Sequence, residues 1–201
     1  MSAVPAPYAY PRGAEMEGSH ATGWWGMVLL IVTEASLFAC LLFSYFYLRA
    51  TVPAWPPVGI DKPDLTLPLP MTAILLLSSV AYWWGERGVR GDRIGQLELG
   101  LGISFLLGAS FLTLQAIEYS HKTFAPQTNA YGSLFFTITG LHGSHVLVGL
   151  IMNAVVQVRT WLGHFTARRH LAIQNVGLYW HFVDAVWLFV FASLYLSPHL
   201  L

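Results

Sequence analysis

Five ionisable side chains lie within apolar stretches of the sequence, where a charge is costly and usually marks a functional position. They are Glu34, His142, His145, His181 and Asp184. His142 and His145 are three residues apart, as are His181 and Asp184, so on helices each pair projects from one face. Imidazole and carboxyl groups that meet inside a protein can hydrogen-bond, exchange protons or bind a metal.

Three interpretations of these residues remain open from their spacing. Neutral histidines and protonated carboxyl groups could hydrogen-bond one another and hold helices together. His145 and His181 could ligate a metal or a haem from two different helices. Glu34 could carry a proton, because desolvation disfavours its charged form. The one cysteine, Cys40, excludes an intrachain disulfide and a multi-thiolate metal site.

The composition is that of an integral membrane protein. Of 201 residues, 55% are apolar and 10% are charged, whereas soluble domains carry about 25% charged residues. Ten basic residues balance ten acidic residues, so the chain lacks the basic excess that binding to nucleic acid requires.

Hydropathy predicts an all-α fold, a bundle of five transmembrane helices. Each apolar stretch is near or above the length of about 20 residues that crosses a bilayer, and too long for the strands of a membrane barrel. Residues 1–23 are expected to form a flexible tail, and residues 24–201 a single domain. Six prolines within residues 49–70 separate the first two helices. The expected spans are 24–48, 67–84, 97–119, 133–158 and 176–196.

The basic residues predict the orientation of this bundle. With a cytoplasmic N-terminus, seven of the ten basic residues fall on the cytoplasmic side and three on the other. The positive-inside rule therefore places the N-terminus in the cytoplasm and the C-terminus in the periplasm.

Depth decides which polar residues can meet. At about 1.5 Å rise per residue, Glu34 and Asp184 lie roughly 15 and 12 Å from the cytoplasmic end, and His145 and His142 roughly 20 and 24 Å. Within helix tilt, we expect both pairs to face the bundle interior near Glu34. Glu118 lies at the end of its span, where an interfacial position is expected. Glycines beside the histidines would let neighbouring helices approach closely.

Four segments resemble subunit III of the haem-copper respiratory oxidases. They follow the family's order and together extend over nearly all of residues 24–196. The segments are WGMVLLIVTEASLF at 25–38, LQAIEY at 114–119, YGSLFFTITGLHGSHVLVG at 131–149 and YWHFVDAVWLFVF at 179–191.

The resemblance implies a short five-helix bacterial form that lacks the first two of seven helices. It implies a subunit without haem, copper or other metal, with a lipid-filled cleft between the first two spans and the other three. Trp24, Arg87 and Arg90 near the cytoplasmic rim are candidates to bind a phospholipid head group.

The resemblance also assigns roles to individual residues. Glu34 matches the family's buried glutamate, which reacts with hydrophobic carbodiimides and is associated with proton uptake. We expect Glu34 to be protonated at neutral pH. Positions matching family motifs are also held by His142, His145, Glu118, His181 and Asp184.

The expected function is that of a non-catalytic, multi-pass subunit of a proton-pumping terminal oxidase in the bacterial cytoplasmic membrane. Haem and copper would reside on the catalytic subunit I and the copper-carrying subunit II, with cytochrome c as donor. A quinol-oxidising complex is one alternative, although its subunits often carry Asp at the position of Glu34. An independent haem-binding membrane protein is a second alternative. A proton-coupled transporter is a third, although the inverted repeat typical of transporters is missing here.

Overall fold

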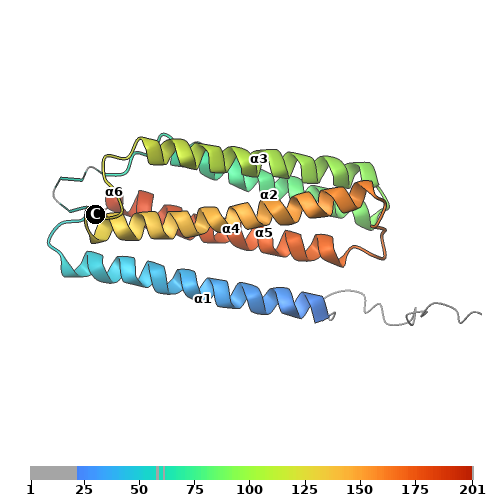
Figure 1. The fold of residues 1–201 in the computed structure, drawn as a ribbon, viewed down its shortest axis with the longest axis horizontal. Helices are drawn as coiled ribbons and strands as arrows, with labels where there is room; N and C mark the ends of the chain where they lie inside the picture. Colours follow the sequence, from blue (N-terminus) through green and yellow to red (C-terminus); the bar gives the residue numbers. More distant parts are fainter. Residues whose placement is uncertain (1–21, 58, 61, 201) are drawn as a thin grey trace, which may run out of the picture.

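The chain folds into long helices, as the apolar stretches predict. The computed structural model describes residues 22–57, 59–60 and 62–200, and within these the only β-type pairing is an isolated bridge between Thr166 and Arg169. The helices run back and forth along one long axis (Figure 1). They are α1 (Thr22–Thr51), α2 (Pro68–Arg90), α3 (Ile94–Ser120), α4 (Ala130–Trp161), α5 (Leu171–Val190), the π-helical segment η1 (Phe191–Leu196) and α6 (Ser197–Leu200).

Each of the helices α1 to α4 contains nearly all of one predicted span and extends beyond it at one or both ends, and the fifth predicted span, 176–196, is divided between α5 and η1. Hydropathy detects the apolar part of a helix, whereas the backbone remains helical through the more polar residues at its ends. Pro68 and Pro70, counted among the six connector prolines although the predicted span begins at 67, stand in the first turn of α2, where a missing N–H costs nothing. Most of the predicted tail, residues 1–21, lies outside the described residues.

Four helices of the described chain, α1, α3, α4 and the continuous stretch Leu171–Leu200, are long and apolar enough to cross a membrane. The helix α2 is not among them by this composition criterion. It nevertheless has 23 residues and packs lengthwise against α3 (Figure 1).

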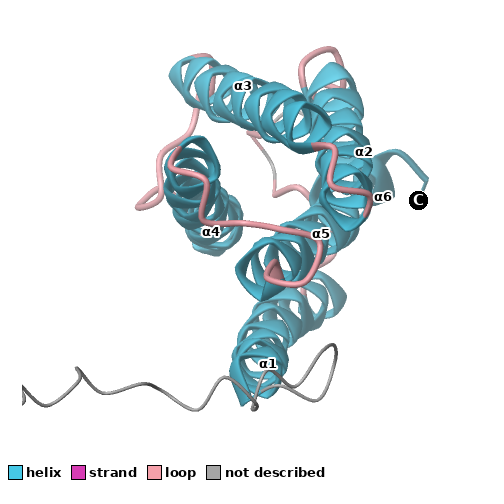
Figure 2. Cartoon of the chain, turned by 90° about the vertical axis from the view of Figure 1, so that its right-hand side faces the viewer, coloured by secondary structure: helices cyan, strands magenta, loops and turns pink. Residues whose placement is uncertain are grey.

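The helices α2, α3, α4 and α5 form a closed group, and α1 lies outside it against α5 and α4 (Figure 2). Of the thirty residues of α1, Phe38 and Tyr45 are buried. The expectation that a cleft would separate the first two spans from the other three is therefore wrong. The boundary lies between α1 and the remaining four helices, because α2 packs against α3 and α5.

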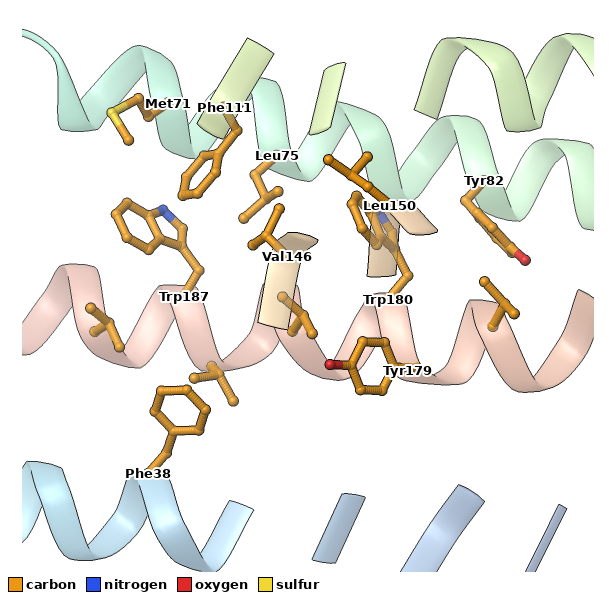
Figure 3. Packing of buried hydrophobic residues seen from close by; sticks show 14 of the residues in the cluster. Phe38, Met71, Leu75, Tyr82, Phe111, Val146, Leu150, Tyr179, Trp180 and Trp187 are labelled. Atoms are coloured by element: carbon orange, nitrogen blue, oxygen red, sulfur yellow. The ribbon is translucent and has the colours of Figure 1, made fainter. Parts of the chain in front are cut away.

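Trp180 joins all four helices of the closed group. It projects from α5 toward α2 and α3 (Figure 3), is fully buried, and donates from Nε1 to Ser78 Oγ on α2 at 3.0 Å. A Cβ on Gly108 of α3 would lie 2.7 Å from this ring, and a Cβ on Gly149 of α4 would lie 2.6 Å from it. These two glycines thus accommodate a neighbouring side chain rather than a neighbouring backbone.

Direct backbone approach occurs between α2 and α3. A Cβ added to Gly100 would lie 2.5 Å from Gly85 Cα and 2.7 Å from the carbonyl oxygen of Ala81. Small residues at a helix crossing allow this close packing in membranes.

We expect Gly100→Ala to destabilise the fold by about 1–3 kcal/mol, because the added methyl group must push α2 away from α3. The matched control is Gly102→Ala on the same helix, where an added Cβ meets nothing within 4 Å. Unfolding of the purified protein in increasing denaturing detergent measures both variants. Equal midpoints for the two variants would contradict this packing.

Candidate functional site

Glu34 and His145 meet between α1 and α4. Glu34 Oε2 lies 3.0 Å from His145 Nε2, and the two side chains are 27% and 12% exposed. Phe38, one turn further along α1, packs edge-on against the imidazole ring at a centroid distance of 5.1 Å. The structure therefore brings together two of the residues that the depth estimate had placed near one another.

The hydrogen bond of the second ring nitrogen of His145 shows that one proton lies between His145 and Glu34. His145 Nδ1 lies 2.8 Å from the backbone carbonyl oxygen of Leu141, which can only accept a hydrogen bond, so Nδ1 carries a hydrogen. A neutral His145 then has a bare Nε2, and Glu34 must donate to it as a carboxylic acid. A charged His145 instead donates from Nε2 to a carboxylate. In both forms the contact between Glu34 and His145 holds one proton.

This pair borders a groove of about 210 Å³ formed by α1, α4 and α5. The groove is lined by Leu30, Glu34, Ser144, His145, Val148, Met152 and Tyr179. Because the Glu34 side chain is partly exposed here, its carboxyl group reaches the surface of the bundle.

His142, one turn from His145, has a different environment. It is fully buried, and its ring packs against Phe38, Phe111 and Trp187 at centroid distances of 6.4, 5.8 and 5.1 Å. Neither of its ring nitrogens has a hydrogen-bond partner among the described residues. His142 therefore packs as an aromatic ring within the core.

His181 and Asp184 face α2 rather than the pair on α1 and α4. His181 Nδ1 lies 2.7 Å from Ser79 Oγ on α2, and Asp184 is 4% exposed. The expectation that both pairs would join one interior cluster near Glu34 is wrong for these two residues. The face of α5 that carries Tyr179 borders the groove beside Glu34, and His181 is turned about 160° from it at 100° per residue.

Glu118 forms a third arrangement at the end of α3. It lies two residues before the end of α3, where the sequence places it, and its side chain is buried within the protein at 4% exposure. Lys122 Nζ lies 2.7 Å from Glu118 Oε1 as an ion pair, at an angle outside that of a hydrogen bond, and Tyr195 donates to Glu118 Oε2 at 3.0 Å. The ammonium group of Lys122 also lies 4.8 Å from the centre of the Phe135 ring. Glu118 is therefore buried with its own counter-charge.

The three rim residues lie on two helices separated by α5. Trp24 on α1 packs edge-on against Trp25, whereas Arg87 on α2 lies 3.8 Å from the centre of the Trp83 ring. Arg90 pairs with Glu86. All three are near the same end of the bundle, where α1 begins and α2 ends (Figure 1).

Metal chemistry finds no support in this arrangement. Within the described part of the chain, no three or more His, Cys, Asp or Glu side chains gather where they could hold a metal ion. His145 is on α4 and contacts Glu34 of α1, whereas His181 is on α5 and contacts Ser79 of α2; both nitrogens of His145 already have partners.

Sequence reasoning missed three residues of these arrangements. Lys122 stands four residues after Glu118, a spacing that brings charged side chains together on a helix and was readable in the sequence. Ser79 and Tyr195 carried no comparable signal, because serines and tyrosines in apolar helices are mostly packing residues.

We expect Lys122→Met to destabilise the protein by about 3–5 kcal/mol, because it leaves the buried carboxylate of Glu118 without a counter-charge. Adding Glu118→Gln to this variant should restore part of the loss, since the unpaired charge is then removed. Lys62→Met, at an exposed loop position, is the control and should stay within about 0.5 kcal/mol. Detergent unfolding measures all three, and an unchanged Lys122→Met would contradict a buried ion pair.

Comparison with known proteins agrees with the four motifs. The family model for cytochrome c oxidase subunit III matches residues 12–198. Cytochrome c oxidase subunit 3 of Myxine glutinosa is 39% identical over 181 residues, which cover 85% of this chain and 68% of that relative. The proteins of the same name from Pan troglodytes and Aedes aegypti are 37% and 38% identical over 177 residues, with the same coverage. The chain therefore belongs to the cytochrome c oxidase subunit III family.

Proposed function

We propose that this chain is a non-catalytic subunit of a proton-pumping terminal oxidase and supports proton uptake and stability of the catalytic subunit. Oxygen reduction would occur on subunit I, with haem and copper held there and on the copper-carrying subunit II. The observation that carries the proposal is the 3.0 Å contact between Glu34 and His145, which can hold a proton, beside the groove between α1, α4 and α5. A redox centre on this chain is not needed for that role.

The electron donor of the complex is proposed to be cytochrome c. This follows the printed names of the relatives, all called cytochrome c oxidase subunit 3. A quinol-oxidising complex would be recognised by the donor that the purified oxidase accepts. Haem ligation by His145 and His181 is disfavoured, because it needs a free nitrogen on each imidazole and those of His145 are both engaged.

We place all five long helices across the bacterial cytoplasmic membrane, with the N-terminus cytoplasmic. The polar groups that lower the hydropathy of α2 include Ser78 and Ser79, which turn toward α5 and away from lipid. Six arginines lie at the end of the bundle where α1 begins, in or beside the connectors after α2 and α4, and the other described basic residues lie at the opposite end (Figure 1). This asymmetry supports the proposed orientation.

Phospholipid is proposed to occupy the boundary beside α1. A second, apolar groove of about 300 Å³ runs between α1 and α5, where Ala35, Ala39 and Ala185 leave room for an acyl chain. At the cytoplasmic rim, Trp24, Arg87 and Arg90 are candidates for contacts with a phosphate head group.

We expect Ala39→Trp to reduce the phospholipid that the complex retains, because the indole ring fills the apolar groove. Native mass spectrometry of the purified complex counts the retained lipids. Ala116→Trp on α3, at an exposed position outside both grooves, is the matched control and should leave the count unchanged. If the complex retains no phospholipid, or both variants lose it equally, a lipid site in this groove is excluded.

We expect Glu34→Gln to abolish carbodiimide labelling, slow proton uptake and leave substantial oxidase activity. The amide of Gln can still donate to His145 Nε2, whereas it cannot release the proton. Glu34→Ala should do more harm, because it leaves a buried nitrogen unsatisfied at a cost of about 1–3 kcal/mol. Oxygen consumption and dye-detected proton uptake in vesicles containing the complex measure these effects.

Ser36→Ala is the control for these variants, since Ser36 lies two residues away on α1 and bonds only within its own helix, to Val32. A complex that assembles with normal haem spectra but has no turnover in Glu34→Gln would overturn the accessory role. Equal effects of Glu34→Gln and Glu34→Ala would show that the hydrogen bond between residue 34 and His145 contributes nothing to function.

A further inference from the structure

A second set of proton-bearing groups lies between α2 and α5, apart from the pair formed by Glu34 and His145. His181 and Asp184 stand three residues apart on α5 and project about 60° from each other. Both turn toward Ser79 of α2, whose Oγ lies 2.7 Å from His181 Nδ1. Ser79 is also the polar neighbour of the Asp184 carboxyl group, although neither oxygen of Asp184 meets the geometry of a completed hydrogen bond.

The surroundings of Asp184 supply no counter-charge. The acidic groups facing α5 from its neighbours are Glu86 on α2 and Glu34 on α1, and the imidazoles are His142 and His145 on α4. Arg49 and Lys122, which contact the stretch after α5 at Ser197 and Tyr195, have other partners. Arg49 donates to Ser197, and Lys122 pairs with Glu118. A buried carboxylate without a cation is strongly disfavoured, so Asp184 holds its proton.

A serine hydroxyl between a carboxylic acid and an imidazole can pass a proton from one to the other. Ser79 donates its hydrogen to a bare His181 Nδ1, and its oxygen can accept a hydrogen from Asp184 when the carboxyl group turns to it. When the proton moves, the O–H bond of Asp184 breaks, Ser79 takes that hydrogen, and its own hydrogen forms the N–H bond of His181. The products are a carboxylate and an imidazolium, so every proton is accounted for and no redox partner is needed.

Glu86 connects this set with the end of the bundle that we place in the cytoplasm. Its side chain is 12% exposed and pairs with the exposed Arg90. Its Oε2 lies 3.2 Å from the position of a Cβ on Gly177, and Gly177 precedes His181 by four residues, so the two share one face of α5. Glu86 therefore lies about one helical turn from His181, on the side toward the rim.

We propose that Ser79, His181 and Asp184 form a second proton-exchanging site, which takes up and releases a proton through Glu86 at the rim of the bundle. The site extends the proposed role in proton uptake to the opposite face of α5. Its ligand is the proton itself, and its store is the carboxyl group of Asp184.

Infrared difference spectroscopy of the purified complex tests the site directly. The carbonyl stretch of a protonated carboxylic acid is observable, and Asp184→Asn should remove one such band. In deuterium oxide this band should shift as its proton exchanges. Ser79→Ala should change the frequency of the band and slow its exchange about tenfold or more, because the bridging hydroxyl is lost.

Two further variants separate proton exchange from a merely structural role. Glu86→Gln should slow the exchange while leaving the frequency of the Asp184 band unchanged, because Glu86 lies on the route without contacting Asp184. Ser78→Ala, the neighbouring serine that accepts from Trp180, should change neither. The proposal is overturned if Asp184→Asn removes no band, if the band does not exchange, or if Glu86→Gln leaves the rate unaltered. These readouts do not involve Glu34, so they fail or succeed independently of the proposed function.

Discussion

The packing of Trp180 determines how the other helices are placed. One indole ring from α5 occupies the space that Gly108 and Gly149 leave open on α3 and α4, and its N–H is satisfied by Ser78 on α2. A large side chain can enter a helix crossing in this way only where the facing helices lack side chains of their own. Inside a bilayer, where lipid is as apolar as leucine, such close packing and hydrogen bonding replace the hydrophobic effect as the source of helix association.

The helix α1 is held to the other four helices more by polar contacts than by apolar packing. With Phe38 and Tyr45 as its buried residues, α1 makes little contact area with the closed group. Polar contacts supplement that area: Glu34 bonds to His145, Arg49 donates to Ser197, and the Gly23 carbonyl accepts from Asn175. These three contacts are spread over the length of the helix. Glu34 therefore contributes to holding α1 in place, in addition to any role in handling protons.

Much of this fold was readable from the sequence, and so was part of the site. Apolar length and the proline-rich connector predicted the helices, and the rise per residue placed Glu34 and His145 at compatible depths. Neighbour relations were not predictable in the same way. Nothing in the composition of α2 shows that it packs against α3 rather than α1, because the close approach of Gly85 and Gly100 becomes evident only when both backbones are placed. For the same reason, spacing indicated that His181 and Asp184 share a face but not which helix that face meets.

The acidic groups inside this bundle are neutralised in ways that follow their depth. Glu118 lies two residues from the end of α3, about 3 Å along the axis, and is paired with a lysine. Glu34 and Asp184 lie twelve and thirteen residues from the starts of α1 and α5, about 18 and 20 Å along the axis. Near the end of a helix a long lysine side chain reaches the carboxylate while its own ammonium group stays close to water. Deeper in the membrane, a second charge would add its own desolvation cost, so a shared proton is the less costly way to neutralise a carboxylate. The deep acids are therefore the ones that face imidazole and hydroxyl groups, which can both give and accept a proton.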